Sequence, residues 1–373
     1  MKKIIFFMII LTFYFVGCAS YEDANLTMFT LVTIIDIDEN NKPIVTMELF
    51  RSLYSQEKAG EMGARFILEG RGDTISEAIS DINQKASYRV NTIHNKMLIF
   101  TDKAAKYGID NFLGMFIRDQ EFLLRPYVMI YEGDPKKLMD TKIRQEEFLG
   151  LYLEELVRNE FAISIHYPER LFEYANLRTI GAKTDILNII KMEGEEPSEV
   201  VIYEGAVIVE DKMVDKLTKH DMRVYTLTME EKTNGFITIP NPQMKGKYVS
   251  LTLLENKIKT EIKYDGKIEN VIHFSKELSF KLSFNETQKI IDLTDQEIRK
   301  KLEAEVKKKI TEESEALFQE YKNKGIDVFD VQATFMRKYP KESSKDVLGR
   351  TKIDIKVEVY IEGSPNTQNF NDN

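Results

Sequence analysis

The chain has 373 residues, and its 61 acidic residues outnumber 52 Lys and Arg residues, which gives a formal net charge of −9. This balance disfavours nucleic acid as a partner, because binding to phosphates needs clustered Lys and Arg. The length is enough for two or three domains with cores of their own. A single cysteine excludes a disulfide bond within the chain.

Residues 1–17 are predicted to form a secretory signal peptide. Two lysines follow the first residue, and an apolar run over residues 4–16 leads to the only cysteine, Cys18. As a helix this run spans roughly 20 Å, short of a hydrocarbon core of about 30 Å, so a permanent transmembrane anchor is the weaker interpretation. The stretch Phe15-Val16-Gly17-Cys18 resembles a bacterial lipobox, whose cysteine receives a diacylglyceryl group. We therefore predict that Cys18 is the lipidation site, on a tether over residues 18–27; an incidental cysteine is the alternative.

Residues 28–192 are predicted to form an N-terminal α/β region with room for two subdomains. Two β-branched runs, 28–37 and 43–50, are typical of a hairpin. Thr74 and Glu77 have the spacing of a helix capping box directly after a predicted strand. Alternating strands and short helices then follow, at 94–103, 107–119, 125–133, 134–140, 146–160 and 168–177.

Residues 193–199 are predicted to be a linker, because they are acidic and contain Gly and Pro. The C-terminal domain, residues 200–363, is predicted as a sheet packed with helices. Its first hairpin turns at Glu210-Asp211, and a tight turn at Asp265-Gly266 joins two long alternating strands within 247–284. Further predicted elements are a helix at 219–231, a long helix at 294–324, strands at 326–340 and 350–363, and a disordered tail at 364–373.

The long helix has the clearest amphipathic pattern of the chain. Thr294 and Glu297 form a capping box at its start, and Gly325 ends it. Together the elements predict an α+β (mixed α/β) fold of two to three domains, each a largely antiparallel or mixed sheet packed with helices, with the helix 294–324 in the C-terminal domain. The apolar stripe of this helix is Ile298, Leu302, Val306, Ile310, Leu317 and Tyr321.

No catalytic, metal-binding or cofactor-binding residue is predicted, and we expect that the protein is not an enzyme. The four histidines each lack a second His or Cys at metal-ligand spacing. The sequence contains no Gly-x-Ser-x-Gly, no phosphate-binding Gly loop and no dinucleotide fingerprint. Acidic residues are abundant, so catalysis by a pair of carboxylates stays open. The histidines are His94, His166, His220 and His273.

Several segments, taken in order, resemble a known family. The first half contains "TIIDIDENNK", "GDTISEAI", "HNKMLIF" and "RPYVMIYEG", and the second contains "EGAVIVEDKMVDKLT", "FMRKYPK" and "KVEVYIEG". This order and spacing resemble the Ger(x)C family, the lipoprotein C subunits of nutrient germinant receptors in spore-forming bacteria. The resemblance covers nearly the whole chain after the signal peptide.

The resemblance implies a function and a location. Family members consist of α/β domains and lie on the outer face of the spore inner membrane, anchored by an acylated (palmitate) cysteine, which is Cys18 here. They work beside a polytopic A subunit and a permease-like B subunit, and spores need them to germinate in response to nutrients. The implied protein is a non-catalytic scaffolding or coupling subunit, with membrane lipid and the A and B subunits as partners. No cofactor is implied, the partner-binding surface stays unknown, and direct nutrient binding stays open.

A solute-binding lipoprotein of a membrane transporter is the alternative hypothesis. Such a protein has two similar lobes that close on a ligand. The predicted second half is a meander of long antiparallel strands plus one long helix, which is unlike a second lobe of strand–helix–strand units.

Overall fold

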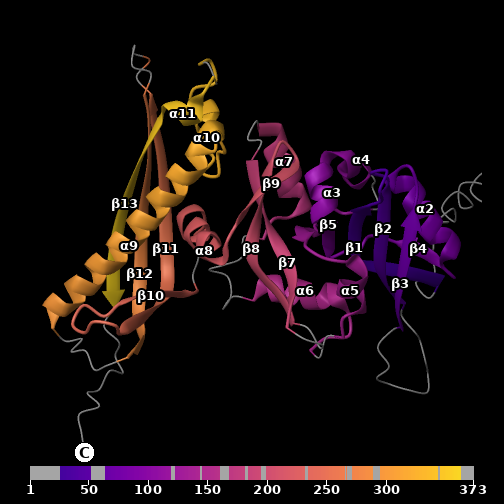
Figure 1. The fold of residues 1–373 in the computed structure, drawn as a ribbon, viewed down its shortest axis with the longest axis horizontal. Coiled ribbons are helices and arrows are strands. Elements are labelled where there is room, and N and C mark those ends of the chain that lie inside the picture. Colours follow the sequence, from indigo (N-terminus) through magenta and orange to yellow (C-terminus); the bar gives the residue numbers. More distant parts are fainter. Residues whose placement is uncertain are drawn as a thin grey trace, which may run out of the picture.

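The computed structural model describes residues 26–51, 64–118, 122–142, 145–159, 168–180, 184–194, 199–231, 234–264, 266, 271–288, 295–342 and 345–362. Within these ranges the strands form two sheets, one of nine strands and one of four. Figure 1 shows the two sheets side by side, each with helices packed against it. The predicted mixed α/β architecture is confirmed.

The strands of the first sheet are β1 (Thr27–Ile37), β2 (Pro43–Arg51), β3 (Ala64–Arg71), β4 (Arg89–Asn91), β5 (Met97–Thr101), β6 (Tyr127–Tyr131), β7 (Thr184–Glu193), β8 (Glu199–Val209) and β9 (Lys212–Leu217). Their order is β3-β2-β1-β5-β6-β7-β8-β9, and β4 pairs with β1. The central strands β1, β5, β6 and β7 are parallel, and both flanks are antiparallel. The predicted hairpin of β1 and β2 is confirmed.

Helices cover both faces of the first sheet. One face carries α2 (Ile75–Lys85), α3 (Asp102–Tyr107), α4 (Asp110–Arg118) and α7 (Leu171–Ile180), and the other carries α5 (Pro135–Asp140) and α6 (Leu149–Arg158). Strands β5 and β6 are therefore buried along their whole length. Their unbroken apolar runs are typical of parallel strands that are covered on both faces.

Helix α2 shows how local sequence signals fix an element. Thr74 Oγ1 accepts a hydrogen bond from Glu77 N at 3.2 Å, so the predicted N-cap is confirmed, whereas the Glu77 carboxylate accepts from Asp73 N at 2.7 Å and does not complete the predicted capping box. Gly70 on β3 lies so close to α2 that a Cβ atom there would be 2.0 Å from the carbonyl oxygen of Ala78. A glycine is therefore required where β3 passes α2.

The second sheet contains β10 (Phe236–Pro240), β11 (Tyr248–Tyr264), β12 (Ile272–Thr287) and β13 (Thr351–Glu362), in that order. The first three strands are antiparallel, and β13 runs parallel to β12. Three helices pack on one face of this sheet or at its end: α9 (Gln296–Asn323), α10 (Val331–Lys338) and α11 (Val347–Arg350). Figure 1 shows α9 crossing the strands obliquely.

Helix α9 buries all six residues of its predicted apolar stripe. Gly325 follows it with φ 71°, the left-handed conformation that ends a helix, as predicted. The cap differs from the prediction: Asp295 Oδ1 accepts from Glu297 N at 2.8 Å, and Thr294 lies outside the described residues.

The strand predicted at 326–340 is wrong, because helix α10 lies there. Buried and partly exposed side chains alternate along residues 331–335, and this period of two is the sequence pattern expected of a strand. The helix starts there because the Asp327 carboxylate accepts hydrogen bonds from Val331 N at 3.0 Å and Gln332 N at 2.7 Å. The cap therefore comes from four and five residues upstream, outside the usual capping position.

One of the two predicted hairpin turns is confirmed. Glu210 and Asp211 join β8 to β9 with φ values of 48° and 64°. The second predicted turn, Asp265-Gly266, includes Asp265, which lies outside the described residues; the last described pair of β11 with β12 is Tyr264↔Ile272.

The linker predicted at 193–199 connects two strands of one sheet. β7 and β8 pair as a hairpin from Thr184↔Val209 to Glu193↔Glu199. The chain leaves the first sheet only after β9 and reaches the second through α8 (Lys219–Met229), a helix that the sequence predicted. Residues 193–199 therefore do not separate the two sheets.

Candidate functional site

The predicted lipidation site, Cys18, lies outside the described residues, as do the signal peptide and the tail 364–373. The described part begins at Leu26, directly before β1. In the ranges that the structure describes, no helix is long and apolar enough to cross a membrane.

The histidines are spread over the molecule. His94 packs edge-on against Phe29, with ring centroids 4.9 Å apart, and His273 is exposed on β12. His220 lies 3.8 Å from a carboxylate oxygen of Glu313, and His166 falls outside the described residues. Within the described chain, no three His, Cys, Asp or Glu side chains are placed to hold a metal ion.

An apolar cluster around α8 joins the two sheets, and we call it the inter-sheet cluster. It contains Ile186 and Val207 of the first sheet, Met222 of α8, Phe274 of β12 and Phe318 of α9. The N-terminal half of α9 packs on the second sheet, whereas its C-terminal half packs in this cluster. Each fully buried side chain of this size contributes roughly 1.5–3 kcal/mol, so the cluster holds the sheets together.

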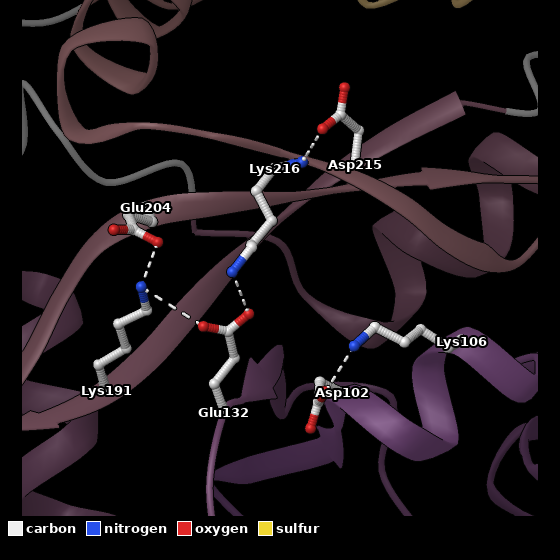
Figure 2. Close-up of polar contacts among 7 residues, drawn as sticks. All are labelled: Asp102, Lys106, Glu132, Lys191, Glu204, Asp215 and Lys216. Carbon is white, nitrogen blue, oxygen red and sulfur yellow. Dashed lines mark hydrogen bonds and ion pairs between the residues drawn. The ribbon is translucent and has the colours of Figure 1, made fainter.

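A polar network crosses four adjacent strands of the first sheet (Figure 2). Glu132, directly after β6, contacts Lys191 on β7 at 3.4 Å and Lys216 on β9 at 2.7 Å. Lys191 also contacts Glu204 on β8 at 2.5 Å. Burial opposes the charge of Lys191, but hydrogen bonds to Glu204 and Glu132 hold its pKa above the ordinary value. Opposite charges therefore alternate across this edge of the sheet.

The end of α9 meets the same edge. Lys324 contacts Asp215 on β9 at 2.7 Å, and the Tyr321 hydroxyl donates to the carbonyl oxygen of Lys216 at 3.3 Å. Hydrogen bonds to Asp215 and Glu320 raise the pKa of Lys324 well above its ordinary value. Because Lys324 is 39% exposed, the ion pair contributes less than about 1 kcal/mol and mainly orients the helix end.

Ionisable side chains are also buried where the first sheet approaches α8 and α10. Burial, followed by the charge of Asp185, raises the pKa of Glu169. Burial raises the pKa of Asp185, and the charge of Asp330, directly before α10, raises it further. A hydrogen bond from Ile186 N to Asp185 opposes this shift. Burial raises the pKa of Asp330 to about 6 and lowers that of Lys276 on β12 to about 8. Carboxylates of both halves of the chain therefore act on one another here.

A cavity of about 520 Å³ opens between α4, α7, the start of β7, the end of β8 and the β8–β9 turn, and we call it the α7 pocket. This volume falls in the range of about 300–1,000 Å³ that is usual for small-molecule sites. Apolar side chains of Ile117, Leu177 and Ile208 line it together with Asp185 and Asp211. Convergent polar groups on apolar walls are typical of ligand sites.

Sequence reasoning identified Glu210-Asp211 only as a turn and missed the pocket around it. Both residues have positive φ, where Asn-Gly is the common pair. Two acidic residues in place of the usual Asn-Gly pair are the one sequence signal that could have pointed to a site at this turn. The other lining residues come from α4, α7 and β7, and no sequence spacing brings them together.

Family models match most of the chain. Residues 20–192 match the "Spore germination protein N-terminal domain", and residues 204–364 match "Spore germination B3/ GerAC like, C-terminal". The chain belongs to the GerAC-like family of spore germination proteins. The resemblance found in the ordered sequence segments is thereby confirmed.

Individual relatives are distant in sequence, and they match between 62% and 96% of this chain. "Spore germination protein GerQC" of Bacillus cereus is 22% identical over 366 residues, which cover 96% of this chain and 98% of the relative. "Putative spore germination protein YfkR" of Bacillus subtilis (strain 168) is 20% identical over 240 residues, 62% of each chain. The structure titled "Crystal Structure of the GerBC protein" aligns with a TM-score of 0.56 at 16% identity, covering 89% of this chain and 97% of GerBC. The last comparison shows a shared fold.

Proposed function

We propose that the chain is the lipid-anchored, non-catalytic C-type subunit of a nutrient germinant receptor. The match of both GerAC-like models, over residues 20–192 and 204–364, is the observation that carries this proposal. A diacylglyceryl group on Cys18 holds the protein on the outer face of the spore inner membrane. Its partners there are the polytopic A subunit and the permease-like B subunit.

The anchor makes weak protein contacts sufficient. Stable membrane attachment takes about two acyl chains, and a diacylglyceryl group supplies both. Confinement to the membrane raises the effective concentration of the subunit at its partners. A net charge of −9 disfavours direct adhesion to anionic lipid, so a covalent anchor strengthens attachment to the membrane.

The role of the subunit is to scaffold and couple. The inter-sheet cluster and the contact of Lys324 with Asp215 support this role, because they tie the second sheet to the first. A displacement of one sheet by a partner is then passed to the other through packed side chains, which resist deformation.

Release of dipicolinic acid from spores tests the proposal. Spores that lack the gene are complemented with wild type or with Cys18→Ser, and release is followed under a panel of nutrients. We expect release to fail in the deletion, to return with wild type and to be impaired with Cys18→Ser at matched protein level. Normal release from deletion spores under every nutrient contradicts the proposal. Loss of solute uptake in growing deletion cells then favours a transporter lipoprotein.

A further inference from the structure

The α7 pocket contains a carboxylate that the protein leaves incompletely hydrogen-bonded. Asp185 Oδ1 accepts from Ile186 N at 2.7 Å, whereas Asp185 Oδ2 is buried and has no hydrogen-bond partner. A buried polar atom without a partner costs free energy, so the site lacks a donor.

Arg178, the cation that lines the pocket together with Asp185, is paired with a different carboxylate, that of Asp211. Arg178 donates to Asp211 Oδ2 through Nε at 3.0 Å and Nη2 at 2.7 Å, and the Tyr174 hydroxyl donates to Asp211 Oδ1 at 2.9 Å. The carbonyl oxygen of Asp211 also accepts from Ile109 N at 2.8 Å, which fixes the turn. Arg178 therefore neutralises Asp211 and leaves the charge of Asp185 uncompensated.

The charges around Asp185 have the same sign. Asp330, Glu173 and Asp211 each raise the pKa of Asp185, and the Asp185 charge in turn raises that of Glu169. Glu173 of α7 and Asp330, directly before α10, thus add to the negative potential at Asp185, whereas Arg178 offsets the charge of Asp211. Such a site attracts a cation from solution.

The walls of the pocket favour an organic cation over a metal ion. No set of three metal-ligand side chains converges among the described residues, and Ile117, Leu177 and Ile208 offer apolar surface. A hydrated metal ion gains nothing from apolar surface, whereas a carbon body gains about 25 cal/mol for each Å² that it buries.

We propose that the α7 pocket binds a small organic amine, with its ammonium group against Asp185 and its carbon body on Ile117, Leu177 and Ile208. The carboxylate charge is shared by both oxygens of Asp185, so the ammonium is attracted from the open side of the cavity. This inference goes beyond the proposed function and does not depend on it.

A proton shared by Glu169 and Asp185 is the competing explanation. Glu169 is 6% exposed, and its Oε1 atom also lacks a partner. Burial and the charge of Asp185 raise the pKa of Glu169, so a proton held on this pair lowers the negative charge beside the pocket. In that case the pocket has no need of a ligand cation.

Calorimetric titration of the full-length chain in detergent separates these explanations. The probes are 2-phenylethylamine and its neutral isostere 2-phenylethanol, each corrected for its titration into empty micelles. We expect saturable binding of the amine with a Kd at least tenfold below that of the alcohol. Asp185→Asn should weaken amine binding at least tenfold, and Ala175→Trp, which fills the pocket, should abolish it. Asp354→Asn, an exposed carboxylate on β13, is the matched control and should bind as wild type does.

Three results overturn the proposal: no saturable amine binding, equal binding of amine and alcohol, or equal binding by wild type and Asp185→Asn. Asp185→Asn is nearly isosteric and removes one of several like charges, so we expect its thermal unfolding to stay at or above that of wild type. Ala175→Trp fills the pocket without changing its charge, so it tests independently whether the amine binds in this cavity. Dipicolinic acid release is not needed to decide the outcome.

Discussion

Lys276 provides a quantitative test of the buried charges between the sheets. It is 3% exposed on β12, and its Nζ donates to the carbonyl oxygen of Thr228 at 3.2 Å. Burial lowers its pKa from 10.5 to about 8, although the charge of Asp330 opposes this. The difference corresponds to about 3 kcal/mol of destabilisation at pH 7, where folding must bury an ammonium group.

The pH dependence of this cost has a definite sign. The unfolded chain binds the Lys276 proton more tightly than the folded chain, so stability rises as the pH increases from about 8 to 10.5. Below pH 8 the cost is nearly complete, and at pH 10 it has fallen to about 0.8 kcal/mol.

Substitution Lys276→Met removes the buried charge and keeps most of the side-chain volume. It also leaves the carbonyl oxygen of Thr228 without a donor, which costs about 1 kcal/mol. We therefore expect Lys276→Met to be more stable than wild type by about 2 kcal/mol at pH 7 and by nearly nothing at pH 10. Urea unfolding followed by circular dichroism at both pH values measures this difference.

The control is Lys281→Met on the same strand. Lys281 is 46% exposed and pairs with Glu362 at the surface, so its replacement should leave the free energy of unfolding nearly unchanged at both pH values. A Lys276→Met protein that is less stable than wild type at pH 7 would refute the reasoning. So would a difference that is the same at pH 7 and pH 10.

Four further substitutions, measured by urea unfolding, test three local features of the fold. Glu48→Ala should cost about 3–5 kcal/mol, because fully buried Glu48 accepts from two N–H groups at the start of α6 and pairs with Arg65; a loss below about 1 kcal/mol would mean that this carboxylate does not cap α6. Gly70→Ala should lower the free energy of unfolding by more than about 2 kcal/mol, because the added methyl group would clash with α2. The matched control is Gly114→Ala on α4, where the added methyl group meets open space and should stabilise the protein by about 0.5–1 kcal/mol. Equal effects of the two substitutions would contradict the close approach of β3 to α2. Asp327→Ala should cost about 1–2 kcal/mol by uncapping α10, and an unchanged midpoint would show that another group caps it.

Elements with complete local signals could be predicted from the sequence. Helix α9 has its stripe and its glycine stop within its own residues, and α2 has its cap at Thr74. Helix α10 could not be predicted, because its buried positions alternate and its cap is Asp327, upstream of the usual position. The strand predicted at 94–103 runs two residues into α3, because Asp102 and Lys103 continue directly from β5.

Contacts between distant residues explain what the sequence could not show. The start of α6 has no side-chain cap of its own, and Glu48, 101 residues away, replaces it. The pairing of β7 with β8 across an acidic, Gly- and Pro-containing segment likewise depends on the whole sheet. The α7 pocket is lined by residues of α4, α7 and the β8–β9 turn, which lie far apart in the sequence. Of these, only the Glu210-Asp211 turn could be predicted from the sequence.

The β7–β8 hairpin determines where this chain can be recombined with a relative. An exchange at residue 193 follows the gap between the two family models, but it would place strands β8 and β9 of one parent against β7 of the other. Side chains on both faces of that junction would then come from different proteins, and the buried positions of β7 would meet unmatched partners. A chimera that keeps β7, β8 and β9 from one parent, and changes parent after β9, preserves the register of the sheet and exchanges the second sheet as a whole.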